Sequence, residues 1–154
     1  MKESANTNAV EVAKVIAEGC LSMRVRFLNR TLNAIYDEAY RDLGMTASQG
    51  NMLVAIVKND ELSPTRLGQL LNIEKSTLSR NLERMRKAGW IEVNEPKFGR
   101  TRSLRATRSG KSMMSSLLPR WEKAQAAAPD LLGDDESDDL KTSVDQARKK
   151  LTHA

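Results

Sequence analysis

Apolar residues recur at spacings of four and three along residues 12–43, which is the spacing of one face of a helix. One stripe runs from Leu21 to Ala39, and a second runs from Val12 to Phe27. Two stripes on one helix need more than one partner surface, and part of that surface could belong to a second subunit. The pattern predicts one long helix that ends at Gly44, a left-handed cap.

Helix start and stop signals then follow in short succession. Thr46 and Gln49 fit a capping box that opens one helix. Ser63-Pro64 opens a shorter helix, which Asn72 closes as a left-handed cap. A further helix is predicted from about Lys75 to Ala88, so the last two helices form a helix-turn-helix.

A short hairpin and two more helices complete the pattern. Gly89 stops the preceding helix, and two strands are predicted at 90–93 and 102–106, with turn-rich residues 94–100 between them. Thr107 caps the next helix, which Pro119 should kink. The buried side of that helix is predicted to carry Met113, Met114, Leu117, Leu118 and Trp121.

A break between Pro129 and Gly133 precedes a last amphipathic helix, whose apolar residues are Leu140, Val144, Ala147 and Leu151. The fold class is therefore mainly α, with a small β-hairpin.

The amino-acid composition argues against several classes of functional site. Cys20 is the only cysteine and His153 the only histidine of the 154 residues. A disulfide framework, a Cys/His metal cluster and a Ser/His or Cys/His nucleophile are therefore not expected within one chain, nor is any cofactor. No catalytic motif marks the sequence as an enzyme. The absence of a long apolar run or a secretory signal predicts a cytoplasmic protein with no membrane partner.

Positive charge is concentrated in one block. Residues 74–108 contain ten Lys or Arg and four Glu, a net of +6, so the rest of the chain sums to about −1 of the total of +5. Such a block is typical of a surface that binds a polyanion, and a solvated charged face is the alternative reading.

The helix from Lys75 to Ala88 concentrates small hydroxyls and cations opposite its apolar stripe. Small side chains let the start of a helix approach another surface closely, and arginine can reach base edges in a major groove. Gly68 would let the preceding helix cross this one closely. The candidate DNA contacts on the helix are Lys75, Ser76, Thr77, Ser79, Arg80 and Arg84, and those on the hairpin are Lys97, Arg100 and Arg102.

These residues resemble the MarR family of bacterial winged-helix transcription regulators. The most specific part is LSPTRLGQLLNIEKSTLSRNLERMRKAGWIEV at 62–93, followed by RATRSGK at 105–111 and LLPRW at 117–121. The resemblance implies an obligate homodimer whose two lobes bind a pseudo-palindromic DNA site, with half-sites about one helical turn apart, ~10 bp. It also implies that the protein represses nearby genes and that a small, frequently phenolic, anionic ligand relieves repression.

The same resemblance divides one domain, 1–154, into functional parts. Residues 46–106 would be the winged helix-turn-helix lobe, and residues 8–43 and 107–151 the dimerisation helices. Met and aromatic side chains at helical spacing could line an effector pocket, although such residues are more often core. The pocket candidates are Tyr36, Tyr40, Met113 and Trp121.

The sequence departs from the family pattern at three places. Phe98-Gly99-Arg100 keeps the wing arginine but lacks the usual aspartate. Glu74 stands where a serine-type cap is common, so it could select bases or simply cap the helix. Cys20 lies near the reactive thiol of the peroxide-sensing branch, which leaves a redox-responsive regulator as one alternative. A winged-helix adaptor that docks an acidic protein is the other alternative.

Overall fold

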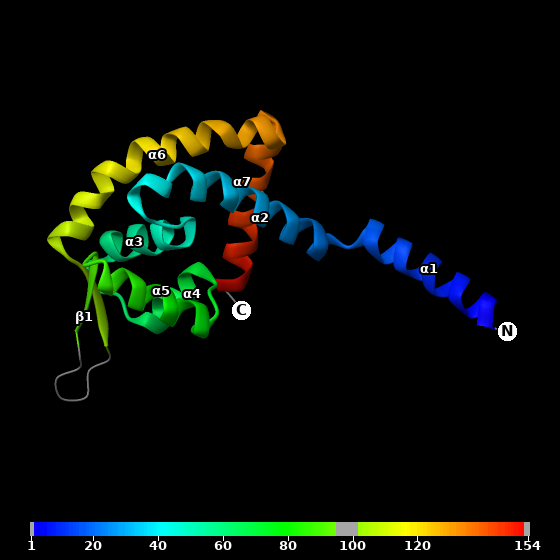
Figure 1. Ribbon diagram of the computed structural model, residues 1–154, viewed down its shortest axis with the longest axis horizontal. Coiled ribbons are helices and arrows are strands. Elements are labelled where there is room, and N and C mark those ends of the chain that lie inside the picture. The colour runs from blue at the N-terminus through cyan, green and yellow to red at the C-terminus, as the bar shows by residue number, and fades with distance from the viewer. Residues whose placement is uncertain (1, 95–101, 153–154) are drawn as a thin grey trace. The chain divides into compact units, whose positions relative to one another are not determined.

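The computed structural model describes residues 2–94 and 102–152. The chain forms two compact units, Met1–Ala34 and Ile35–Ala154. The described helices are α1 Lys2–Gly19, α2 Leu21–Ala39, the 3-10 helix η1 Arg41–Leu43, α3 Ala47–Asn59, α4 Pro64–Leu71, α5 Lys75–Lys87, α6 Arg108–Leu132 and α7 Asp134–Thr152. Strands β1 Ile91–Asn94 and β2 Ser103–Ala106 form an antiparallel pair (Figure 1). The predicted fold class, mainly helical with one small hairpin, is confirmed.

The long helix predicted for residues 12–43 is interrupted. It divides at Cys20 into α1 and α2, and η1 follows α2 before Gly44 adopts the predicted left-handed conformation, with φ of 64°. Gly19 has a low helix propensity, which favours a break there. The guanidinium of Arg24 donates hydrogen bonds to the carbonyl oxygens of Glu18 and Cys20, so its side chain binds carbonyl oxygens on both sides of the break.

The predicted caps of the helix-turn-helix segment are confirmed. Thr46 Oγ1 accepts a hydrogen bond from the Gln49 backbone N–H, and Gln49 Oε1 accepts one from the Thr46 N–H, which completes the capping box. Ser63 Oγ accepts from the Arg66 N–H at 3.1 Å. Asn72 ends α4 in the left-handed conformation, with φ of 50°. These local bonds fix where α3 and α4 begin and where α5 can start.

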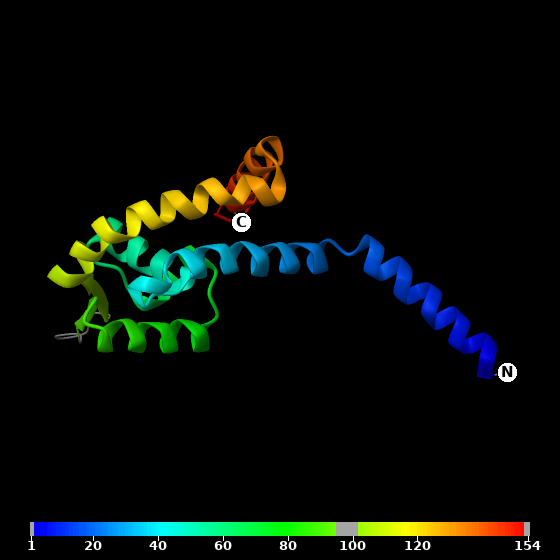
Figure 2. The ribbon, with the colours of Figure 1, turned by 45° about the horizontal axis from the view of Figure 1, so that its top comes forward.

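Helix α3 forms the centre of the second unit. Met52, Leu53 and Ile56 on α3 are fully buried. Figure 2 shows α3 between α6 on one side and α5 on the other, in agreement with the packing of α3 against both. Helix α5 therefore lies at the edge of this unit, where only one of its faces is needed for the core.

The hairpin is joined to α4 through a contact far apart in sequence. Leu62, just before α4, pairs with Leu104 of β2 as an isolated antiparallel bridge, with N–H to O distances of 3.3 and 2.8 Å. Leu104 is fully buried. This bridge ties the base of the wing to the start of the helix-turn-helix.

Helix α6 ends where the sequence predicts, but two side chains of its predicted buried side are exposed. It continues through Pro119 and Pro129 to Leu132, so the break predicted between Pro129 and Gly133 lies at Gly133. A proline removes one backbone donor without forcing the chain to turn, whereas Gly133 has φ of 93°, a conformation that favours glycine. Leu118 and Trp121 were predicted to be buried, but they are 54% and 44% exposed. Leu117 is buried as predicted.

Candidate nucleic-acid interface

Helix α5 presents two sharply different faces. Its apolar stripe of Leu78, Leu82 and Met85 is buried in the core, as the spacing predicts. Gly89, with φ of 74°, ends the segment and directs the chain into β1. The opposite face is left open because α5 lies at the edge of the unit (Figure 2).

The candidate residues on α5 occupy that open face. Thr77 is half-buried, and the others, Lys75, Ser76, Ser79, Arg80 and Arg84, are exposed. We call these six residues the α5 ridge. The structure therefore brings together all the helix residues that were singled out from the sequence.

Weak local hydrogen bonds orient the ridge. Arg80 Nε donates to the Ser76 carbonyl oxygen at 3.3 Å, and its Nη2 donates to Thr77 Oγ1 at 3.4 Å. Both bonds are long, so little free energy is lost when the guanidinium turns to a stronger acceptor. Asn81 Nδ2 donates to the Thr77 carbonyl oxygen at 3.1 Å and adds a further link to the same turn.

Ion pairs on α5 separate two sets of cations. Glu83 accepts two hydrogen bonds of 3.0 Å from Arg86 and lies 3.6 Å from Lys87 Nζ. The hydrogen bonds from Arg86 lower the pKa of the Glu83 carboxyl below its ordinary value, although both side chains are exposed. In residues 2–94 and 102–152, no carboxylate pairs with the ridge cations Lys75, Arg80 and Arg84. Their charge remains available for an external anion.

The close crossing of α4 and α5 depends on Gly68. A Cβ atom placed on Gly68 would lie 3.2 Å from Cδ2 of Leu78 and 3.5 Å from the carbonyl oxygen of Ile73. Those contacts are tight, so a larger residue would push α4 away from α5. The interpretation of Gly68 as a crossing residue is supported by this geometry.

The wing is described only at its base. Strand β1 pairs with β2 from Ile91–Ala106 to Asn94–Ser103. Arg102 is exposed directly before β2. Lys97 and Arg100 lie outside the described residues, so their predicted contacts stay predictions.

Two residues at the wing base were missed by the sequence analysis. Thr107 was expected only to cap α6, and its Oγ1 does accept from the Gly110 N–H at 3.0 Å. The same hydroxyl donates to the Gly89 carbonyl oxygen at 2.6 Å and so ties the end of α5 to the start of α6. A Cβ atom on Gly110 would lie 2.0 Å from the carbonyl oxygen of Trp90. Its only sequence signal was a glycine three residues after a cap.

The four pocket candidates do not share one environment. Tyr40 is 3% exposed and belongs to the core, where it meets the Tyr36 ring edge to face at 6.1 Å. Tyr36 donates from its hydroxyl to Oε1 of Gln125 at 2.7 Å, and burial raises its pKa. Met113 packs against the core, whereas Trp121 is 44% exposed.

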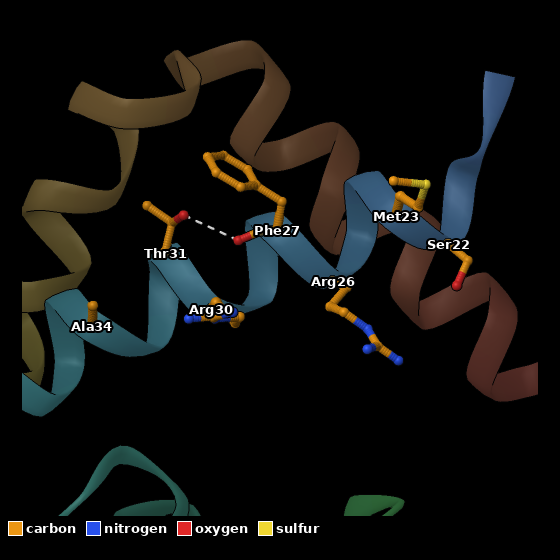
Figure 3. A pocket seen from close by; sticks show the side chains of 7 residues that line it. All are labelled: Ser22, Met23, Arg26, Phe27, Arg30, Thr31 and Ala34. Atoms are coloured by element: carbon orange, nitrogen blue, oxygen red, sulfur yellow. Dashed lines mark hydrogen bonds between the residues drawn. The ribbon is translucent and has the colours of Figure 1, made fainter. Parts of the chain in front are cut away.

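A groove of about 840 Å³ lies elsewhere, along one face of α2. Figure 3 shows Phe27 and Met23 on this face, with Arg26 and Arg30 on the same helix. Its other lining residues are Ser22, Thr31 and Ala34. All seven belong to the first unit, so the groove is an uncovered helix face that combines apolar and cationic side chains.

Other chemistry has little support among the described residues. Cys20 is a free, half-buried thiol at the junction of α1 and α2. Residues 2–94 and 102–152 hold no group of three or more His, Cys, Asp or Glu side chains that could bind a metal. Within the same ranges, no helix is long and apolar enough to cross a membrane.

Comparisons with known proteins agree with this geometry. Residues 43–100, from η1 to the wing, match a family model described as MarR family. Among curated proteins, the chain is similar to the uncharacterized HTH-type transcriptional regulator YybA of Bacillus subtilis (strain 168). The two are 20% identical over 128 residues, which cover 82% of this chain and 85% of YybA.

Solved structures of MarR proteins share the fold over most of the chain. A mutant E. coli MarR complexed with operator DNA superposes with a TM-score of 0.74 at 20% identity, over 86% of this chain and 96% of that one. The M. tuberculosis transcriptional regulator MosR gives a TM-score of 0.72 at 25% identity, over 88% of this chain and 97% of MosR. The segment 43–100, which holds the helix-turn-helix, therefore matches the MarR family, and the chain as a whole shares the fold of these MarR transcriptional regulators.

Proposed function

We propose that this protein is a dimeric, sequence-specific repressor that places α5 in the major groove of a pseudo-palindromic DNA site. The observation that carries the proposal is the α5 ridge, in which hydroxyls share one open helix face with cations that pair with no carboxylate of residues 2–94 and 102–152. A helix that served only the core would not need this combination. The bound operator DNA of the related E. coli structure supports the same assignment.

The ridge residues divide by chemistry. Arginine donates two parallel hydrogen bonds to guanine O6 and N7, so Arg80 is assigned the base contact. Lys75 and Arg84 neutralise phosphates, and Ser76, Thr77 and Ser79 bond phosphates or base edges. On the wing, Lys97, Arg100 and Arg102 are assigned to the backbone and the adjacent minor groove. In this account, residues 46–106 form the DNA-binding lobe, and a DNA target places the protein in the cytoplasm.

The first unit supports dimerisation. Of the fourteen large hydrophobic side chains that are exposed among the described residues, eight lie between Val10 and Phe27. Leu21 and Phe27 are 72% and 74% exposed. Together these eight side chains offer apolar surface of the same order as the ~800 Å² that each partner of a standard interface buries. A second copy of the chain is the proposed cover, with residues 8–43 and 107–151 as the dimerisation helices.

Charge complementarity favours the same partner. Arg26 and Arg30 flank the groove on α2, and like charges at this spacing on a helix repel one another. The first six residues of α7, 134–139, contain five carboxylates. A second copy that brings its α7 to this groove would place opposite charges together while it covers Phe27 and Met23.

For regulation, we propose a small aromatic anion as the effector. Support comes from the family resemblance and from Trp121, which is exposed on the same helix as half-buried Met113. Tyr40 contributes to the core, and Tyr36 already bonds Gln125, so these two would shape the pocket wall. Salicylate is a suitable probe. Release of bound DNA by salicylate, weakened in Trp121→Ala, is expected; release of equal strength in both proteins would exclude this pocket.

The proposed function is tested by the DNA that the purified protein retains. Genomic fragments recovered on the immobilised protein should share a sequence with two-fold symmetry and half-sites about one helical turn apart, ~10 bp. Deletion of the gene should raise transcription beside those fragments. Recovery of fragments with no common sequence, or of a protein partner that remains after nuclease treatment, would contradict the proposal.

A further inference from the structure

Glu74 is the N-cap residue of α5, yet it does not act as a cap. The N-cap residues Thr46, Ser63 and Thr107 each accept a backbone N–H from the helix that they precede. Glu74 has φ of −56° and ψ of 139°, and its side chain makes no such hydrogen bond. Its carboxylate is therefore not used to begin the helix, in contrast to the other three caps.

The carboxylate is also weakly held by its neighbours. Ser76 Oγ donates to Oε2 of Glu74 at 3.4 Å, which is a long hydrogen bond. Among the described residues no lysine or arginine forms an ion pair with it. Glu74 is exposed. An acceptor with most of its capacity unused thus stands at the leading end of the ridge.

Glu74 and Arg80 both form hydrogen bonds with Ser76. Glu74 bonds the hydroxyl of Ser76, and Arg80 bonds its carbonyl oxygen. The ionised carboxylate of Glu74 only accepts hydrogen bonds, and the guanidinium of Arg80 only donates them. Two side chains that hydrogen-bond the same residue would face base pairs close to one another once α5 enters the major groove.

The four bases differ in whether they can hydrogen-bond the Glu74 carboxylate or the Arg80 guanidinium. In the major groove, cytosine offers an N4 amino donor, whereas guanine and thymine offer carbonyl acceptors that repel a carboxylate. Adenine also offers an amino donor, N6, but its N7 acceptor lies beside it and repels a carboxylate, so cytosine is the better partner. A carboxylate that met only phosphates would oppose binding, because both groups are anionic. A cytosine near the guanine that Arg80 contacts would give the Glu74 carboxylate a hydrogen-bond donor and would offset its repulsion by the phosphates.

We propose that Glu74 is a specificity-determining residue that accepts a hydrogen bond from the amino group of cytosine in the half-site. The inference rests on the proposed function, since it requires α5 to lie in the major groove. It deepens that function by naming one base of the operator and its distance from another. The cytosine lies within about one to three base pairs of the guanine, since six helical residues span ~9 Å and base pairs stack every ~3.4 Å.

Selection of binding sites from a random duplex library tests this inference. The wild type should select sites with cytosine at one position near a guanine. Glu74→Ala should retain the guanine and lose the cytosine preference by tenfold or more, within the range measured for a good base contact. Glu74→Gln should shift the preference toward adenine, which glutamine can bond at N6 and N7. Thermal unfolding of both variants checks that α5 still folds.

Glu122→Gln is the matched control. Glu122 is exposed on α6, so the variant changes the net charge equally without touching the ridge. It should select the wild-type sequence. If Glu74→Ala and Glu74→Gln select the same base at every position as the wild type, with equal discrimination, the inference is overturned while the proposed function stands. If the wild type selects no sequence at all, the proposed function fails and takes the inference with it.

Discussion

Gly110 lies so close to Trp90 that no side chain fits between them. A Cβ atom at Gly110 would be 2.0 Å from the Trp90 carbonyl oxygen and 2.9 Å from its carbonyl carbon. The same carbonyl accepts hydrogen bonds from the Thr107 N–H at 3.0 Å and from Thr107 Oγ1 at 3.2 Å. The start of α6 is thereby fixed against the strand that leaves α5, which sets the position of the wing relative to the ridge.

We expect Gly110→Ala to destabilise the protein by about 3 kcal/mol or more, at or beyond the upper end of overpacking costs, because backbone atoms must move to admit the methyl group. Gly19→Ala is the control, since a Cβ atom there meets nothing within 4 Å. It should leave stability unchanged or raise it by up to ~1 kcal/mol. Urea unfolding at one fixed protein concentration measures both. Equal stability of Gly110→Ala and the wild type would show that this contact is not tight in solution.

The Asp42–Arg120 pair predicts a particular acid sensitivity. Arg120 donates three hydrogen bonds to the Asp42 carboxylate, at 3.2, 3.2 and 2.5 Å, and these lower the pKa of Asp42. A carboxyl with a lowered pKa stabilises the folded state fully above its ordinary pKa of ~4 and loses that contribution as pH falls through the lowered value. Asp42→Asn should therefore flatten the fall in unfolding free energy below about pH 4.

The effect must depend on the arginine. In an Arg120→Gln background, Asp42→Asn should change the pH profile far less than in the wild type. A double-mutant cycle of unfolding free energies at several pH values gives this comparison. Identical effects of Asp42→Asn in both backgrounds would assign the pH dependence to another group.

A substitution on the exposed face of α2 is expected to weaken dimerisation. Phe27→Asp should shift the protein from dimer to monomer, because it places a charge where a second copy is proposed to bury an aromatic ring. Val54→Asp is the matched control, since Val54 is 43% exposed on α3, outside the first unit. Sedimentation equilibrium distinguishes the mass of one chain from that of two. A dimer of Phe27→Asp as tight as the wild type would contradict the proposed interface.

The structural features that are best predicted from the sequence are those that depend on residues close together in the chain. The caps at Thr46, Ser63 and Asn72 involve partners within four positions, so their chemistry is readable from the chain. The orientation of α5 was predicted equally well, because Leu78, Leu82 and Met85 define a buried stripe and the ridge must lie opposite.

The features that were missed depend on distant partners or on competing local effects. The approach of Gly110 to Trp90 and the bridge from Leu62 to Leu104 join residues that only the folded chain brings together. Trp121 was expected to be buried because large apolar residues usually are, but the apolar face of one chain exceeds what that chain alone can cover. The missing cap at Glu74 was left open because residue type does not fix where a carboxylate points.

The central claim, that the α5 ridge reads DNA, is tested most directly by fluorescence anisotropy with a selected duplex and a scrambled duplex at several salt concentrations. Arg80→Ala should lose discrimination between the two by roughly 1–3 kcal/mol, which is the range for a good base contact. Arg41→Ala, which removes an exposed arginine that pairs with Glu38, should retain it. Wild-type discrimination in Arg80→Ala at every salt concentration would contradict the assignment of α5 as the recognition helix.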